Sequence, residues 1–353
     1  MTRKLFIVAL VSFSLVLTGF SCNFKKEVDM TGGVFKSLDG GLTWAQKGFI
    51  TSTEEETLTL NGYNIRDVAL HPSNPSLVFA ATNANGLYRS TDDAASWTPT
   101  GLDAGQITSV AVDPGNAQVL YATSGRFLYK SSDQGDHWEQ LYTDSRSGER
   151  LFNVAVDAFD SQRIYISNGS GALFKSYDGG NNWQQIHWFD EPIQLLRLSP
   201  ADTRHVYAVV GNKEGLFFSS DGGENWESFR DRLRSISRDT LTIHDLAFHP
   251  TRPEIIYIGT DYGLLKSEDA GQTWATVKTL INFGAEAIRN VAFNPLNPEQ
   301  MYHSTAQLVY VSDDGGFTWK ALTALPSQRT INQLVIHPTD TDTIYVGLLQ
   351  ENE

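Results

Sequence analysis

A motif of eight residues, Ser-x-Asp-x-Gly-x-x-Trp, recurs seven times along this chain of 353 residues and constrains its fold more than any other feature. Six copies keep the Gly, and all seven keep the Ser, the Asp and the Trp. Successive copies begin 41 to 53 residues apart, and a period near this length predicts the blades of a propeller. The copies begin at Ser37, Ser90, Ser131, Ser176, Ser219, Ser267 and Ser312.

Two strand-like segments recur between the motifs. The first has the form of "IRDVALHP", which begins at Ile65, and the second has the form of "IIYIGT", which begins at Ile255. Alternating and β-branched residues between Gly, Pro and Asn turns are typical of β-strands. Together with the strand before each motif and the strand that starts near its Trp, they give each unit four strands.

The order of these segments predicts how a ring would close. The motif at 37–44 has no strand of the Ile65 type before it, and the last such strand, within 331–348, has no motif after it. Because closure removes exposed strand edges, these two halves should combine into one blade. We therefore predict an all-β fold, a seven-bladed β-propeller of four-stranded antiparallel blades over residues 33–349, with a last blade built from both chain ends.

The aspartates of the motif are predicted to hold turns together. An Asp side chain accepts hydrogen bonds from nearby backbone N–H groups, and Gly supplies a positive φ. Seven near-identical turns spread around a rim are a poor arrangement for one active site. The aspartates with this structural role are Asp39, Asp92, Asp133, Asp178, Asp221, Asp269 and Asp314.

The motif resembles the Asp-box, or BNR repeat, and the resemblance covers almost the whole chain after its N-terminal segment. The repeat is found in sialidases, sortilin-type receptors, xyloglucanase-like glycoside hydrolases and photosystem II assembly factors. The resemblance implies a propeller whose boxes lie between the third and fourth strands of each blade, away from the ligand face. It does not select one function, because the class contains enzymes, receptors and assembly factors.

The N-terminus is typical of an export signal. Arg3 and Lys4 precede the apolar run 5–20, which is short for a membrane span. Cys22, the sole cysteine, follows this run and resembles a bacterial lipoprotein site. We expect a signal peptide at 1–21, lipid attachment at Cys22 and a tether at 22–32. Ordinary cleavage after Ser21, which would give a secreted protein, is the alternative.

Composition narrows the choice of partners. The formal net charge is −14, from 41 acidic and 27 basic residues, which argues against nucleic-acid binding. The histidines are dispersed, so no metal site and no cofactor is expected. We expect a monomer that contacts a membrane only through its lipid and binds an envelope protein or an extracellular glycan.

Two regions are candidate ligand sites. The innermost strands begin with polar residues that should ring the channel mouth, where they would either bind a ligand or satisfy one another. These residues are Arg66, Asp67, Ser109, Asn153, Gln194, His244, Asp245, Arg289, Asn290, Asn332 and Gln333. The second region is the connecting loops, where Trp188, Asp190, Arg230 and Arg234 are the candidates.

The enzyme signatures of the class are missing from the sequence. It contains no FRIP-like segment of the sialidases and no nucleophile elbow, P-loop or HExxH. We therefore expect a non-catalytic binding or assembly propeller. The alternative is a glycoside hydrolase, which needs two carboxylates across a cleft; Asp67, Asp190, Asp245 and Asp261 are candidates. A sortilin-like peptide receptor is a third hypothesis, although that class has a larger ring.

Overall fold

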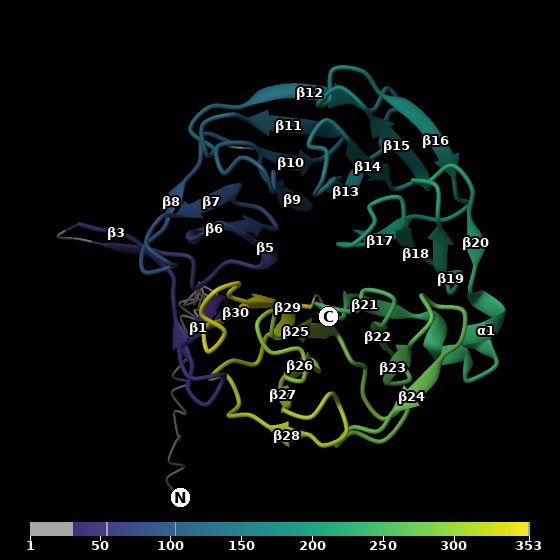
Figure 1. Cartoon of the computed structure of the whole chain (residues 1–353). Helices are drawn as coiled ribbons and strands as arrows, with labels where there is room; N and C mark the ends of the chain where they lie inside the picture. The colour runs from purple at the N-terminus through teal and green to yellow at the C-terminus, as the bar shows by residue number, and fades with distance from the viewer. Residues whose placement is uncertain (1–30, 54–55, 103, 352–353) are drawn as a thin grey trace, which may run out of the picture.

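The computed structural model describes residues 31–53, 56–102 and 104–351, and these form a seven-bladed β-propeller (Figure 1). Each blade is an antiparallel sheet of four strands, which confirms the predicted fold class. Blade 1 contains β5 (Ile65–His71), β6 (Asn74–Thr82), β7 (Leu87–Ser90) and β8 (Thr98–Pro99). Blade 2 contains β9 (Ser109–Val112), β10 (Leu120–Ser124), β11 (Phe127–Ser131) and β12 (Glu139–Thr143). Blade 3 contains β13 (Leu151–Val156), β14 (Ile164–Asn168), β15 (Ala172–Ser176) and β16 (Gln184–Trp188). Blade 4 contains β17 (Ile193–Leu198), β18 (Val206–Val210), β19 (Gly215–Ser219) and β20 (Glu227–Ser228). Blade 5 contains β21 (Ile243–Phe248), β22 (Ile256–Thr260), β23 (Leu264–Ser267) and β24 (Ala275–Val277). Blade 6 contains β25 (Asn290–Phe293), β26 (Met301–Ser304), β27 (Val309–Ser312) and β28 (Lys320–Ala321).

Blade 7 is assembled from both ends of the propeller, as the sequence predicts. Its strand order is β2 (Ala45–Gln46), β1 (Gly33–Ser37), β30 (Ile344–Leu349) and β29 (Thr330–Ile336). The β1–β30 pairing closes the ring, with Phe35 opposite Val346. At the junction with blade 1, the Lys36 ammonium and the Tyr345 hydroxyl both donate hydrogen bonds to the Asp93 carboxylate.

The Asp-box turns connect the third and fourth strands and share one hydrogen-bond pattern. The Ser Oγ accepts the N–H of the fifth box residue at 2.7 to 2.8 Å in all seven boxes. The Asp carboxylate accepts the N–H of the seventh residue at 2.7 to 2.9 Å. In the last box, the Thr318 hydroxyl, the Thr318 N–H and the Ser312 hydroxyl lower the pKa of Asp314 to about 2. The carboxylates are thus engaged within their own turns, as the turn prediction requires.

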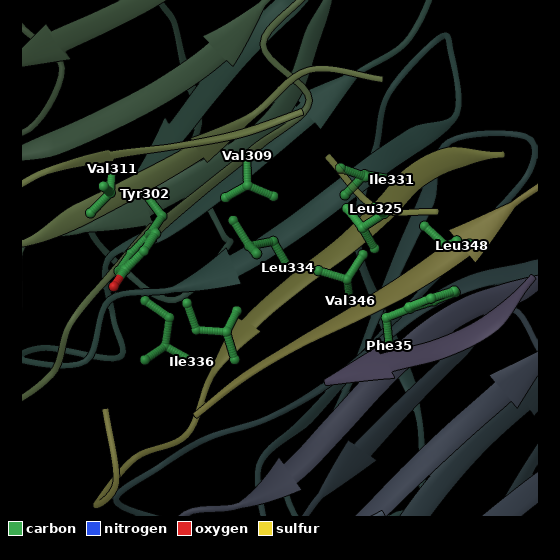
Figure 2. Packing of buried hydrophobic residues seen from close by; sticks show 11 residues of the cluster. Phe35, Tyr302, Val309, Val311, Leu325, Ile331, Leu334, Ile336, Val346 and Leu348 are labelled. Carbon is green, nitrogen blue, oxygen red and sulfur yellow. The ribbon is translucent and has the colours of Figure 1, made fainter. Parts of the chain in front are cut away.

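The core is divided among the contacts between neighbouring blades. Seven clusters of buried apolar side chains form, one at each contact between adjacent blades. Figure 2 shows the cluster between blades 6 and 7, where Tyr302 and Val309 lie near Leu334 and Val346. Each box Trp packs on the cluster that its blade shares with the preceding blade; Trp226 of blade 4, for example, joins Tyr165 and Leu173 of blade 3.

Buried tyrosines on the second strands reach the Asp-box of the next blade. Tyr165, Tyr207 and Tyr257 donate hydroxyl hydrogen bonds of 3.2 to 3.3 Å to carbonyls at the fourth box position of the following blade. Burial raises the pKa of all three phenols, so they remain donors at neutral pH. The boxes are therefore also hydrogen-bonding partners for neighbouring blades.

Two insertions depart from the blade pattern. The connection between blades 7 and 1 contains the hairpin of β3 (Phe49–Ser52) and β4 (Thr57–Thr59), which projects outward in Figure 1. The connection between blades 4 and 5, interpreted from the sequence as a long loop, forms the short helix α1 (Arg230–Arg234) and the 3-10 helix η1 (Arg238–Leu241). Phe229 and Leu233 are buried there, and their burial supports the helical turn.

The predicted signal peptide, Cys22 and all of the tether except residues 31 and 32 lie outside the described residues. Within the described part of the chain, no helix has both the length and the apolar character needed to cross a membrane.

The box tryptophans generate a stability prediction. Trp226→Ala removes a half-buried indole from the contact between blades 3 and 4 and should lower the free energy of unfolding by about 3 kcal/mol. The matched control is Trp188→Ala, because Trp188 lies outside the boxes and is 46% exposed, so its loss should cost less than about 1 kcal/mol. Denaturant unfolding of both variants measures the difference, and equal losses would contradict the packing role of the box Trp.

Candidate functional site

A polar cavity of about 460 Å³ opens where the innermost strands begin, at the centre of the ring. In each blade the turn between the second and third strands and the connection to the next blade lie on this face, opposite the Asp-boxes. Figure 1 shows β5, β9, β13, β17, β21, β25 and β29 nearest the centre. The cavity is bordered by residues of blades 1 to 5 and 7, among them Arg66, Asp67, Gln194, Arg197, His244 and Asn332.

The strand register explains which side chains reach the mouth. In the eight-residue segment that begins at Ile65, the second position holds Arg66, and the matching residues of the other blades form one ring. In blade order this ring is Arg66, Thr108, Phe152, Gln194, His244, Arg289 and Asn332. Because the ring closes between blades 7 and 1, Arg289, Asn332 and Arg66 lie in successive blades.

Polar side chains at the third position connect most of the innermost strands to the next one, and blade 4, which has Leu195 there, is the exception. The Asp67 carboxylate accepts the Val110 N–H at 3.1 Å, and the Asp245 carboxylate accepts the Val291 N–H at 3.0 Å. In blades 3 and 6 an amide takes the same role, because Asn153 Nδ2 donates to the Ile193 carbonyl and Asn290 Nδ2 donates to the Ile331 carbonyl. In blade 7 the third-position Gln333 Nε2 donates to the Arg66 carbonyl at 3.4 Å, and Asn332 Nδ2 at the second position donates to the Ile65 and Arg66 carbonyls.

These contacts assign inter-blade roles to six residues that the sequence placed among the ligand candidates: Asp67, Asn153, Asp245, Asn290, Asn332 and Gln333. Asp67 and Asn332 still border the cavity, whereas Asn290 is 4% exposed and also donates to Ser304 Oγ. Their polar atoms therefore satisfy the backbone of neighbouring strands, as the alternative hypothesis of mutual satisfaction proposed.

The two mouth carboxyl groups have similar electrostatic environments. Burial raises the pKa of Asp67, opposed by the Val110 N–H and by the charge of Arg197. Burial also raises the pKa of Asp245, opposed by Arg197 and by the Val291 N–H. A glycosidase pair needs environments that move the two pKa values apart, so that one group is an acid while the other is ionised. Here both pKa values move upward for the same reason.

Arg197 is a site residue that our sequence analysis missed. It occupies the fifth position of the innermost strand, where five other blades have Ala and blade 7 has Val335. Blade 4 also has Leu195 at the third position, where most blades place a connecting polar group. Arg197 instead reaches the next blade, with its guanidinium 3.5 Å from Asp245 Oδ1. The signal that could have identified it is this break in the repeat, "IQLLRLSP" against "IRDVALHP".

The remaining basic residues of the mouth differ in whether a carboxylate of the protein already contacts them. His244 Nε2 lies 2.7 Å from Asp261 Oδ1, which fixes the ring at the rim of the cavity. The Arg289 guanidinium forms an ion pair of 2.8 Å with Glu351, so a carboxylate near the end of the chain already occupies this arginine. For Arg66, which borders the cavity, the structure shows no carboxylate within ion-pair distance among the described residues.

The loop candidates separate into two places. Trp188 ends β16, and one face of its indole is covered by the Arg146 guanidinium at 4.9 Å from the ring centre. Asp190 is exposed two residues later. Arg230 and Arg234 lie on α1, where they border a second cavity of about 380 Å³. The loop residues therefore do not converge on the mouth.

Within the described ranges, no cluster of three or more His, Cys, Asp or Glu side chains has the geometry to hold a metal ion. The three histidines that precede Pro have another role: the Nδ1 atoms of His71, His249 and His337 each accept backbone N–H groups of the following turn.

Comparisons with known proteins agree with this architecture. A family model described as sortilin, neurotensin receptor 3, matches residues 126–261. No curated protein is similar enough in sequence to count as a match.

Solved structures similar to this chain include a GH74 xyloglucanase from Xanthomonas campestris, with a TM-score of 0.66, 20% identity and coverage of 89% of this chain and 52% of that chain. YCF48 bound to a D1 peptide has a TM-score of 0.63 and 15% identity, with 82% of this chain and 94% of that chain covered. The extracellular domain of a protein from B. thetaiotaomicron, described as a one-component system, has a TM-score of 0.62 and 14% identity, with 85% and 39% covered.

At these identities the similarities show the fold. The chain spans about half the length of the GH74 enzymes that it matches. It is comparable in extent to YCF48, which it covers almost completely.

Arg197 generates a pH-dependent prediction. Arg197→Ala should leave the fold intact, because Ala fills this position in five other blades, but it removes a cation that lowers the pKa of Asp245. A carboxyl group whose folded pKa is raised loses stability as the pH rises from its unfolded pKa through its folded pKa. The variant should therefore be less stable than the natural protein by about 1 kcal/mol at pH 7, and by less at pH 4.

Urea unfolding at the two pH values measures this difference. The control compares Asp245→Asn with the double variant Arg197→Ala and Asp245→Asn: because both lack the Asp245 carboxyl group, the deficit between them should change less between pH 4 and pH 7, and the change that remains reflects Asp67, whose pKa Arg197 also lowers. A deficit of the single variant that is the same at both pH values would contradict the coupling between Arg197 and Asp245.

Proposed function

We propose that this Asp-box β-propeller is an exported, lipid-anchored protein of the cell envelope that binds or helps to assemble a partner and does not catalyse a reaction. Its ligand site is the channel mouth, and its ligand is an acidic segment of an envelope protein. The observation that carries this proposal is that the acidic and the basic side chains of the mouth make different contacts. Asp67 and Asp245 are engaged with the backbone of the next blade, whereas Arg66 and Arg197 face the cavity.

The charges at the mouth favour an anionic ligand. Arginine presents several N–H donors in a planar fork and binds carboxylates bidentately. The pairing of Arg289 with Glu351 supports this chemistry, since a carboxylate of the chain itself is bound on this face. Gln194 is exposed at the same rim and adds a neutral hydrogen-bonding group.

The comparisons support a binding role without fixing the partner. YCF48, a propeller of similar extent, is described as bound to a D1 peptide. Export is supported by the signal-like N-terminus and by the extracellular domain among the similar structures. Anchoring rests on Cys22, the sole cysteine, which follows the apolar run 5–20.

A binding experiment tests the proposal. A hexapeptide of glutamate should bind the purified protein in low salt, and Arg66→Ala should weaken that binding about tenfold, because a charge-assisted contact is lost. The matched control is Arg204→Ala, since Arg204 is exposed and already pairs with Asp202 in a turn on the opposite face. Isothermal titration calorimetry gives the affinities, and equal binding by both variants would contradict a ligand site at the mouth.

The same preparation distinguishes a hydrolase. A panel of aryl glycosides and of soluble β-glucans should show no turnover. Turnover that Asp67→Asn or Asp245→Asn abolishes, in variants that unfold like the natural protein, would move the protein to the glycoside hydrolases.

A further inference from the structure

A second cavity, of about 380 Å³, lies on the same face as the mouth but towards the rim, between blades 4 and 5. One wall is the turn that joins β18 to β19, and the other is formed by α1 and η1. Its lining consists of Asn212, Lys213, Arg230, Arg234, Arg238 and Leu241. Four of the six residues are cationic, in a protein whose formal net charge is −14. We call this cavity the basic pocket.

The two walls of the basic pocket are held together by a specific contact. Arg230 Nε donates to the Lys213 carbonyl at 3.2 Å, which connects α1 to the turn. Leu241 is 3% exposed and supplies the apolar floor, and Asn212 Nδ2 is held by Glu191 at 3.0 Å. The pocket volume lies within the range of small-molecule sites. The arginines therefore line a formed concavity.

The charges in the basic pocket do not balance. The Lys213 ammonium lies 3.6 Å from Asp239, and the Arg230 guanidinium lies 3.7 Å from Glu214. Within the described part of the chain, no carboxylate lies within ion-pair distance of Arg234 or Arg238, both of which are exposed. Two of the four cations are thus paired with carboxylates, a third carboxylate, Glu191, is bound to Asn212, and Arg234 and Arg238 are the two uncompensated cations, without an ion-pair partner among the described residues.

The turn that joins β18 to β19 holds two residues with positive φ at the edge of the pocket. Asn212 and Lys213 both have positive φ, 53° and 64°, as a two-residue hairpin turn requires. Asn and Gly adopt this conformation readily, whereas a Lys side chain is strained there. Ala94, Gln134 and Ala270 have a similar positive φ in the Asp-box turns, so this conformation alone does not mark a site. It does place the Lys213 side chain at the edge of the pocket.

We propose that the basic pocket binds the phosphate group of a phosphomonoester. A phosphomonoester carries close to two negative charges at neutral pH, which matches the two uncompensated cations, and its oxygens suit the guanidinium fork. A sulfate ester or a carboxylate carries one charge and matches less well. The proposal is independent of the function proposed for the channel mouth, because none of the residues lining the basic pocket lines the mouth cavity.

Phosphate binding can be measured directly by isothermal titration calorimetry on the purified protein. The probes are inorganic phosphate, glucose 6-phosphate and O-phosphoserine, with glucose 6-sulfate and acetate as singly charged comparisons. The phosphate probes should bind at least about tenfold more tightly than the singly charged ones, since a second charge-assisted contact is gained. Equal affinity for the three phosphate probes identifies the phosphate group itself as the ligand. Tighter binding of one ester shows that the pocket also contacts the organic group to which that phosphate is attached. Both results support the proposal.

Variants locate the site. Arg234→Gln and Arg238→Gln should each weaken phosphate binding about tenfold. The matched control is Arg232→Gln on the same helix, because Arg232 pairs with Glu227 at 2.6 Å and does not line the pocket. Lys213→Gly is the most specific variant: Gly accepts a φ of 64°, so the midpoint of thermal unfolding should stay the same or rise while phosphate binding weakens.

Three results would overturn the proposal: no binding of any phosphate probe at 10 mM, equal binding of the phosphate and singly charged probes, or phosphate affinity that Arg234→Gln and Lys213→Gly leave unchanged. Arg66→Ala, which alters the mouth alone, should leave phosphate affinity unchanged, so a failure here is distinguishable from a failure of the function proposed for the mouth.

Discussion

The structure depends on hydrogen bonds and apolar contacts between neighbouring blades, because a single four-stranded blade has little core of its own. Each contact contains one of the seven apolar clusters, to which the Asp-box Trp of one blade contributes. On the inner side, polar groups at the start of the innermost strands bind the backbone of the next strand. Pairing of β1 with β30 makes the series of contacts continuous around the ring.

The need for contacts between neighbouring blades limits which polar residues of the mouth can bind a ligand or act in catalysis. Asp67 and Asp245 have the chemistry of catalytic acids and border or approach a central cavity, yet each accepts an N–H from the next blade. The side chains that face the cavity without such a connection are mainly basic or neutral. Arg66 and Arg197 therefore line the central cavity of a protein that is acidic as a whole.

The repeated features of the fold could be predicted from the sequence, whereas the site could be predicted only in part. The seven boxes and the divided last blade follow from the spacing of Ser, Asp and Trp, because each repeat must contribute the same contacts. Arg66 and His244 were predicted to lie at the mouth because polar residues begin the innermost strands, and both border the central cavity. Arg197 was missed, since its importance lies in the one blade that departs from the repeat. The residues that line the basic pocket are spread over positions 212–241 of the sequence. They come together only because the connection between blades 4 and 5 folds into α1 and η1.

The central claim is that the mouth carboxyl groups connect blades and do not form a catalytic pair. The most direct measurement is a carbon-13 NMR titration of the Asp67 and Asp245 carboxyl groups, assigned with Asp67→Asn and Asp245→Asn. The account predicts that both groups titrate above about 3.9, the usual Asp value, because burial raises both pKa values. One group ionised well below that value and the other protonated well above it would contradict the account and indicate an acid and nucleophile pair.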